Sequence, residues 1–221
     1  MLRLKASKWM RVISGQHKEI VMPLYDRQEK LELNTDTSIT VVGVGGVGFW
    51  VAKFAAMTGI EEIHLFDPDT IETHNLNRLD LSLKFLGKNK ADVGRLVINT
   101  IRPNCKVKAF GMKLQEYMFG DTKWLIDCTD NFESQEMNYK IATSHGANYM
   151  KVGYDGEQFS INNKIAEWGE AEDGYVVIPS WCVPASIVGA LAVAKIVKYP
   201  VLEVARNVES LFNYGKKQTK K

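Results

Sequence analysis

Short apolar runs alternate with longer amphipathic stretches over residues 39–153. The short runs are rich in β-branched residues and predict strands, whereas an apolar position at every third or fourth residue predicts helices. The predicted strands are residues 39–42, 62–66, 106–110, 124–127 and 149–153, and the predicted helices are residues 48–58, 84–101 and 131–145. Because strands that alternate with helices form parallel sheets, we expect an α/β fold with a mostly parallel sheet and helices on both of its faces.

The pattern changes after residue 153. Residues 157–169 and 174–181 have the short alternating pattern of antiparallel strands, and residues 184–198 predict a helix rich in small side chains. We therefore expect a short antiparallel extension toward the C-terminus. In domain terms, we expect residues 1–37 to pack on the core, residues 38–215 to form one domain, and residues 216–221 to be a basic tail.

A glycine-rich turn connects the first predicted strand to the first predicted helix. Its four glycines are Gly43, Gly45, Gly46 and Gly48. The spacing G-x-G-x-x-G at a strand-to-helix turn lets a phosphate approach the backbone and the unpaired N–H groups of the helix N-terminus. Asp67 ends the next strand, where a carboxylate can accept hydrogen bonds from ribose hydroxyls. These features predict a Rossmann-like nucleotide-binding domain.

Composition narrows the class of protein. The chain is 45% hydrophobic and 24% charged with a net charge of +2, which is typical of a soluble globular protein and gives no support for nucleic-acid or membrane binding. Three widely separated cysteines favour reduced thiols over disulfides, and without a C-x-x-C pair no zinc site is expected. The longest apolar run breaks at Lys195, too early for a membrane helix. We expect a cytoplasmic protein.

Polar residues after the predicted strands distinguish between two kinds of nucleotide. Arg78 and Lys90 follow the second strand, and "DCTDN" at the end of the fourth offers Asp127, Asp130 and Asn131. Loops after parallel strands converge at one edge of the sheet, so these groups should gather over the glycine turn. A dinucleotide needs little more than a helix N-terminus, whereas expelling pyrophosphate from a triphosphate needs cations. The cluster favours a triphosphate, with Asp130 holding Mg²⁺ and Asp127 serving only to cap its turn.

The ordered motifs G-x-G-G-x-G, D-x-D, N-L-x-R, G-x-x-K and D-x-T-D-N resemble those of the E1-like adenylating superfamily, which includes ThiF, MoeB and the adenylation domains of ubiquitin-activating enzymes. The resemblance covers about residues 39–199 and identifies residues 38–215 as an adenylation domain. It implies the following roles: Gly46 in the nucleotide loop, Asp67 and Asp69 of D-x-D at the ribose side, Asn75 and Arg78 at the β- and γ-phosphates, Lys90 near the α-phosphate, and Asp130 at Mg²⁺ with Asn131 beside it.

The resemblance implies an enzyme that uses ATP and Mg²⁺ to adenylate the C-terminal carboxylate of a ubiquitin-like or sulfur-carrier β-grasp protein, or of a peptide. A homodimer is also implied. A carboxylate is already ionised at neutral pH, so its attack on the α-phosphate needs no general base, and positioning and charge neutralisation suffice. Three alternatives stay open: an NAD-linked oxidoreductase, an inactive nucleotide-binding scaffold, and ATP-dependent dehydration of a modified tRNA.

The sequence leaves the roles of three positions open, and the structure is needed to place them. Cys182 precedes a predicted helix, whose N-terminus would lower a thiol pKa, so it is either a catalytic cysteine of the kind found in some relatives or a structural one. Gln135 stands where the family commonly carries a basic residue. The family's N-terminal arginine, often donated across a dimer interface, has Arg27 as its main candidate.

Overall fold

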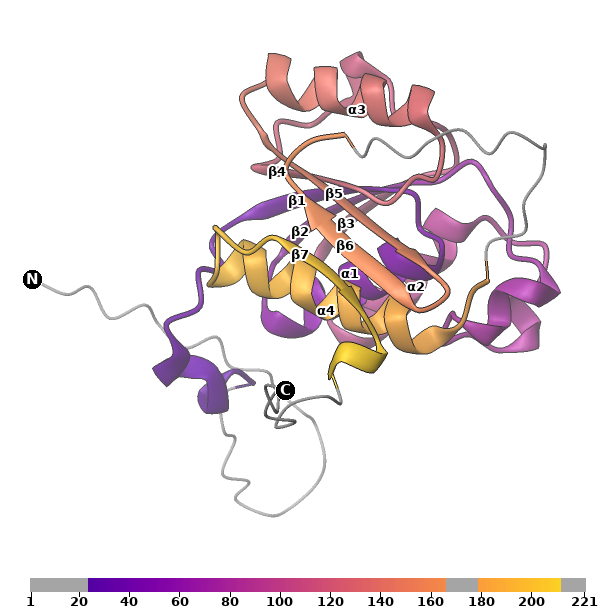
Figure 1. The fold of residues 1–221 in the computed structure, drawn as a ribbon, viewed down its shortest axis with the longest axis horizontal. Coiled ribbons are helices and arrows are strands. Elements are labelled where there is room, and N and C mark those ends of the chain that lie inside the picture. The colour runs from indigo at the N-terminus through magenta and orange to yellow at the C-terminus, as the bar shows by residue number, and fades with distance from the viewer. Residues whose placement is uncertain (1–23, 166–178, 212–221) are drawn as a thin grey trace, which may run out of the picture.

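One sheet organises the molecule. The structure is a computed structural model that describes residues 24–165 and 179–211. Within this part, the strands follow the spatial order β3-β2-β1-β4-β5-β6-β7 (Figure 1). The first five strands pair in parallel, and β6 and β7 are antiparallel additions. The strands are β1 (Ser38–Val42), β2 (Glu62–Phe66), β3 (Lys106–Phe110), β4 (Trp124–Asp127), β5 (Asn148–Asp155), β6 (Gln158–Asn162) and β7 (Val204–Asn207).

Helices cover both faces of the sheet, as predicted. Figure 1 shows α3 on one face and α1, α2 and α4 on the other. Alternate residues of a strand point to opposite faces, so Val41 packs in the larger core under α1 and α4, and Val42 packs in the smaller core under α3. The helices are α1 (Gly46–Thr58), α2 (Lys90–Ile101), α3 (Phe132–Ser144) and α4 (Cys182–Val197). None of the described helices combines the length and apolarity that crossing a membrane requires.

The predicted helix over residues 84–101 is wrong at its N-terminal end. Gly87 has a φ of +75°, a left-handed conformation that interrupts a helix. The chain forms only a short 3-10 helix, η3 (Leu83–Phe85), and α2 starts at Lys90. Asn89 caps α2, since its side-chain oxygen accepts a hydrogen bond from the Asp92 N–H at 3.1 Å.

The C-terminal part differs from the prediction in two places. The antiparallel extension is confirmed by β6, but its next strand is β7, which the sequence analysis missed because its four residues show no apolar alternation. Residues 174–178 of the other predicted strand lie outside the described residues, and residues 179–181 form no strand. α4 begins at Cys182, two residues before the predicted start.

The described part of the N-terminal segment contacts the far end of α1. It contains the 3-10 helix η1 (Asp26–Leu31). Gln28 Nε2 donates to the carbonyl of Thr58 at 2.6 Å, and the Tyr25 ring lies against Gly59, which ends α1. Residues 1–23 and the predicted basic tail lie outside the described residues.

Candidate nucleotide-binding site

Open α/β sheets bind ligands in a crevice at the carboxyl edge where the strand order reverses, and in this sheet the order reverses at β1. The chain runs from β1 to β2 and β3 on one side, and then places β4 and β5 on the other side of β1. The loops after β1 and β4 therefore diverge, which is where open α/β sheets bind ligands. Gly43, directly after β1, lies against the ends of both neighbouring strands. Its N–H donates to the carbonyl of Phe66, the last residue of β2, at 2.8 Å, and a Cβ atom here would lie 3.0 Å from the carbonyl oxygen of Cys128, which follows β4.

Three of the four glycines of the turn are needed for different physical reasons. Gly43 has a φ of +84°, and a Cβ atom on Gly48 would lie 1.8 Å from the Gly43 carbonyl oxygen, so both are required by the turn itself. Gly45 is different, since nothing lies within 4 Å of the position its Cβ atom would take. It is the N-cap of α1, where unpaired N–H groups attract an anion. Gly45 therefore leaves an open approach to the helix N-terminus.

Asp67 is hydrogen-bonded to the glycine turn. Its Oδ2 atom accepts a hydrogen bond from the Val44 N–H at 2.6 Å, and its Oδ1 atom accepts one from the Asp69 N–H at 2.8 Å. The residue is 3% exposed, and burial raises the pKa of this carboxyl, opposed by the two N–H donors and the charge of Lys90. A buried carboxylate with a perturbed pKa at the edge of a crevice is typical of a functional site.

Lys90 reaches the same loop from α2. Its Nζ atom lies 2.9 Å from Asp69 Oδ2, and its N–H donates to the Asp69 carbonyl at 2.9 Å. Asn89 fixes the arrangement, because its Nδ2 atom donates to the carbonyls of Asp67 and Asp69. The start of α2 at Lys90, six residues later than predicted, thus brings Lys90 to the D-x-D loop that the sequence predicted as its neighbour in the site.

Arg78 lies over the start of α1. Its Cδ atom is 3.0 Å and its Nε atom 3.3 Å from the position that a Cβ atom on Gly46 would take. Its Nη1 atom donates to the His74 carbonyl at 2.9 Å and to Asn77 Oδ1 at 3.1 Å, and Trp50 Nε1 donates to the Arg78 carbonyl. The side chain is therefore positioned from both the α1 side and its own turn.

Asn75 is buried within the turn that carries Arg78. It belongs to η2 (Thr73–Asn77), and its Oδ1 atom accepts a hydrogen bond from the Glu72 N–H at 3.0 Å. The Glu72 side chain in return accepts from the Asn75 N–H, which completes a capping box. Its contacts therefore stabilise the Arg78 turn.

The turn after β4 separates two aspartates. Asp127 is completely buried; its Oδ1 atom accepts from the Thr129 N–H and hydroxyl, and its Oδ2 atom accepts from Asn138 and Tyr149. Asp130 is exposed, and its carboxylate makes no hydrogen bond or ion pair within the described part of the chain. Asn131 caps α3 by accepting from the Ser134 N–H at 2.8 Å. Asp130 is thus the carboxylate free to take a cation.

Two residues of this edge were missed by the sequence analysis, which treated residues 149–153 only as a buried strand. Lys151 is 4% exposed, and its Nζ atom donates to the Thr129 carbonyl at 2.5 Å, so it holds the turn that precedes Asp130. The Tyr154 hydroxyl is 2.7 Å from the position a Cβ atom on Gly46 would take. The available signal was their position at the carboxyl end of a parallel strand.

The cysteines fall into two environments, and all three are free. Burial raises the pKa of Cys105 to about 11 and that of Cys128 to about 12, so both thiols stay protonated at neutral pH. Cys182 is exposed and is the first residue of α4. Its segment is tied to the Arg78 turn, because Asn77 Nδ2 donates to the Ser180 carbonyl at 2.7 Å.

Arg27 does not approach the glycine turn of its own chain. Its neighbours Tyr25 and Gln28 donate to the Ala56 and Thr58 carbonyls at the C-terminal end of α1. The helix has 13 residues and is therefore about 20 Å long, with the glycine turn at its other end. Arg27 could complete only the site of another copy.

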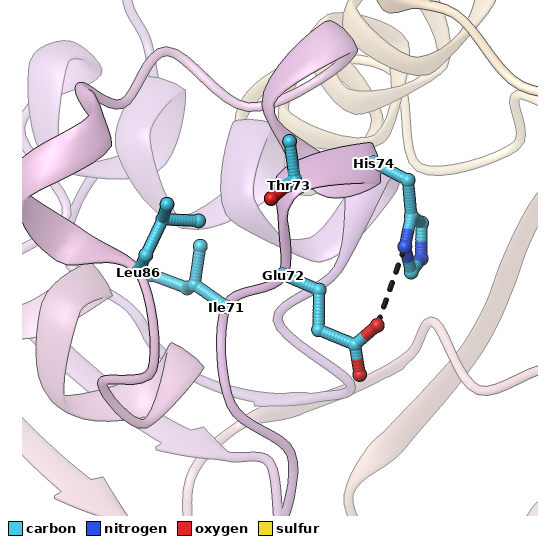
Figure 2. A pocket seen from close by; sticks show the side chains of 5 residues that line it. All are labelled: Ile71, Glu72, Thr73, His74 and Leu86. Carbon is cyan, nitrogen blue, oxygen red and sulfur yellow. Dashed lines mark ion pairs between the residues drawn. The ribbon is translucent and has the colours of Figure 1, made fainter.

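A pocket is formed beside the start of η2. It has a volume of about 590 Å³ and is lined by Ile71, Glu72, Thr73, His74 and Leu86 (Figure 2). His74 Nδ1 and Glu72 Oε2 form an exposed ion pair at 3.3 Å, drawn as the dashed line. None of the predicted site residues lines it. Among the described residues, no three His, Cys, Asp or Glu side chains gather in a group suited to a metal ion.

Comparison with known proteins decides the family. A family model described as the ThiF family matches residues 17–168. The chain belongs to the ThiF family. The resemblance predicted from the five ordered motifs is therefore confirmed, and the solved structures agree on the fold. Escherichia coli MccB, in a crystal structure with AMPCPP and selenomethionine MccA, gives a TM-score of 0.69 at 18% identity over 84% of this chain and 71% of that one.

Curated relatives have different named activities. The chain is 25% identical over 67% of its length to ubiquitin-like modifier-activating enzyme 5 of Oryza sativa subsp. japonica, and covers 39% of that protein. It is 28% identical over 54% of its length to adenylyltransferase and sulfurtransferase MOCS3 of Drosophila sechellia, covering 27% of it. It is 36% identical over 47% of its length to tRNA threonylcarbamoyladenosine dehydratase of Escherichia coli K12, covering 41% of it. The chain thus spans well under half of each of these relatives.

Proposed function

We propose that this ThiF-family chain is an ATP-dependent adenylyltransferase that activates a carboxylate as an acyl adenylate and releases pyrophosphate. The observation that supports the proposal is that two positively charged side chains lie at segments in contact with the glycine turn. Arg78 lies over Gly46, and Lys90 lies at the Asp67–Asp69 loop that is hydrogen-bonded to Val44 of the glycine turn. Two positive side chains suit a triphosphate better than a dinucleotide.

The residues present also fit the cation that ATP carries. Mg²⁺ prefers carboxylate oxygens and retained waters, and Asp130 offers an unengaged carboxylate beside the crevice. When bound, Mg²⁺ would neutralise charge on the phosphates. Asp67 would hold the ribose side, Lys90 the α-phosphate region, and Asn75 would keep the Arg78 turn in place for the β- and γ-phosphates. The attacking carboxylate needs no general base. The residues of the chain therefore have to position the two substrates and neutralise the charge on the phosphates.

For the acceptor, we propose the C-terminal carboxylate of a ubiquitin-like or sulfur-carrier protein, or of a peptide. Relatives named as a ubiquitin-like modifier-activating enzyme and as an adenylyltransferase and sulfurtransferase support the first two. The likeness to MccB solved with MccA is a likeness of fold. We further propose a homodimer, in which Arg27 of one copy is the candidate for the other copy's site, and we leave Cys182 as the candidate for a covalent intermediate.

Dehydration of a modified tRNA is the second candidate function. It is favoured by the 36% identity to a tRNA threonylcarbamoyladenosine dehydratase. The net charge of +2 gives it little electrostatic support, because phosphate contacts with RNA are made by clustered basic residues. ATP turnover that depends on tRNA carrying threonylcarbamoyladenosine would establish this candidate.

The test of adenylation is exchange of labelled pyrophosphate into ATP with Mg²⁺ and a panel of ubiquitin-like and sulfur-carrier proteins. We expect Arg78→Ala and Asp130→Ala each to lower exchange by roughly 100-fold or more, because each removes charge stabilisation from the transition state. Arg95→Ala is the matched control, since within the described residues Arg95 pairs only with Asp92, on the surface of α2.

Two outcomes would contradict the proposal. Normal exchange in both site variants would reject the roles given to Arg78 and Asp130. Slow ATP hydrolysis with no exchange across the whole panel would favour an inactive nucleotide-binding scaffold.

A further inference from the structure

Two side chains from distant parts of the chain converge on the first residue of α1. The position that a Cβ atom on Gly46 would take lies 2.7 Å from the Tyr154 hydroxyl and 3.0 Å from Arg78 Cδ. Any side chain at this position would push one of them away. Glycine at position 46 leaves room for both the tyrosine hydroxyl and the arginine side chain.

The Tyr154 side chain is held in place by packing. The ring packs against the larger hydrophobic core, and the residue lies near the C-terminal end of β5. Among the described residues, its hydroxyl makes no hydrogen bond. A positioned phenol O–H beside an arginine and a helix N-terminus is a donor suited to an anionic oxygen.

Residues 179–181 are hydrogen-bonded both to the end of β5, near Tyr154, and to the turn that carries Arg78. Trp181 Nε1 donates to the Gly156 carbonyl at 2.8 Å, and the Gly156 N–H donates to the Pro179 carbonyl at 2.8 Å. Asn77 Nδ2 donates to the Ser180 carbonyl at 2.7 Å. The end of β5 and the Arg78 turn are therefore bound to the same short segment, which fixes Tyr154 relative to Arg78.

We propose that Tyr154 is a substrate-contacting residue whose hydroxyl donates a hydrogen bond to the diphosphate portion of ATP, the part that leaves as pyrophosphate. This rests on the proposed function, in which Arg78 binds the β- and γ-phosphates. The hydrogen bond is charge-assisted, and it stays with the pyrophosphate after the bond from the α-phosphorus to the bridging oxygen breaks. AMP lacks both outer phosphates and cannot receive it.

The test compares Tyr154→Phe with wild type by isothermal titration calorimetry in MgCl₂, using ATP, pyrophosphate and AMP as ligands. We expect affinity for ATP and for pyrophosphate to fall roughly 10- to 100-fold, as for loss of a hydrogen bond to a charged group, with AMP affinity unchanged. The control is Tyr139→Phe, which removes a hydroxyl on the opposite face of the sheet, where Tyr139 packs against Tyr149. It should leave all three affinities unchanged.

Gly46→Ala is a second variant, which disturbs the same two side chains by adding a methyl group next to them. Its methyl group would displace the Tyr154 hydroxyl or the Arg78 side chain, so it should reproduce the selective loss of ATP and pyrophosphate. In the double variant Tyr154→Phe with Arg78→Met, the two losses should be less than additive, because both groups contact one anion.

Each remaining outcome is decisive. An unchanged ATP affinity in Tyr154→Phe, or equal losses for ATP and AMP, would overturn the role of Tyr154 while leaving the proposed function standing. A wild-type chain that binds neither ATP nor pyrophosphate would overturn both.

Discussion

At the residue scale, burial gives identical side chains different tasks. Asp127 and Asp130 are three positions apart, yet Asp127 has no exposed surface and four hydrogen-bond donors around it, whereas Asp130 is exposed and unengaged. A fully bonded carboxylate stabilises a turn, and an open one can bind a cation. The sequence analysis preferred Asp130 because Asp127 ends a buried strand and would only cap the following turn. The donors that Asn138 and Tyr149 supply to Asp127 follow only from the packing of α3 and β5.

His64 shows the same effect on proton binding. It is 1% exposed, and neither ring nitrogen has a hydrogen-bond partner within the described residues, although Glu62 Oε1 lies 3.3 Å from Nε2. Burial lowers the pKa of His64, and Lys108, its partner across the β2–β3 pair, lowers it further, while Glu62 opposes both. The folded protein therefore favours the neutral imidazole.

We expect the free energy of unfolding to fall as the pH decreases. The unfolded histidine takes up a proton near its ordinary pKa of about 6.5 and the buried one resists, so stability is full above about pH 6.5 and is lost as the pH falls through the lower folded pKa. The loss is at most about 1.4 kcal/mol per pH unit for one proton. Urea unfolding at several pH values should show a weaker dependence in His64→Leu, and an unchanged one in the exposed control His74→Asn. Equal dependence in wild type and His64→Leu would contradict this.

At the element scale, the ends of helices position the chemistry. The predicted helix at residues 84–101 followed apolar periodicity through Gly87, whereas the left-handed conformation of that glycine and the cap at Asn89 move the start to Lys90. This places Lys90 at a helix N-terminus, where its backbone and side chain both bind Asp69. The motif G-x-x-K selected Lys90 as a candidate, whereas periodicity predicted its helix but placed the start of that helix six residues too early.

The start of α1 allows folding and binding to be separated with two alanine substitutions. Gly48→Ala places a methyl group 1.8 Å from the Gly43 carbonyl oxygen, so the backbone must move, and we expect a loss of stability of at least about 1–3 kcal/mol. Gly45→Ala meets nothing within 4 Å, so stability should change by less than about 0.5 kcal/mol. Its methyl group faces the open approach, so ATP affinity should fall roughly 10-fold or more.

Urea unfolding and calorimetry with ATP measure these two effects separately. A Gly45→Ala variant that binds ATP like wild type would mean that the nucleotide does not approach along this side of the turn.

At the scale of the whole molecule, strand order gathers the candidate site residues. Parallel β1, β2 and β4 bring the glycine turn, Asp67 and the Asp130 turn to one edge of the sheet, although these segments are far apart in the chain. The antiparallel β6 and β7 extend the β5 side, and the segment before α4 ties that side to Arg78. A ligand bound at this edge contacts several elements at once and should stabilise the fold as a unit.

We therefore expect ATP with Mg²⁺ to raise the midpoint of thermal unfolding. At 100 times the dissociation constant a ligand adds about 2.7 kcal/mol, and each kcal/mol raises the midpoint by about 2–4 °C for a chain of this size, which gives roughly 5–11 °C. NAD at the same concentration should produce no comparable shift. A shift with NAD that exceeds the shift with ATP would instead support the oxidoreductase hypothesis.

The sequence by itself determined the fold class, the five parallel strands, the glycine turn and the family, because periodicity and motif spacing are local properties of the chain. Only the tertiary structure decided that α2 begins at Lys90, that β7 completes the extension, and that Arg27 lies at the wrong end of α1 for its own site. It alone placed Tyr154 next to Gly46 and Lys151 against the Thr129 carbonyl. Such contacts join segments that are distant in the chain, and no local pattern records them.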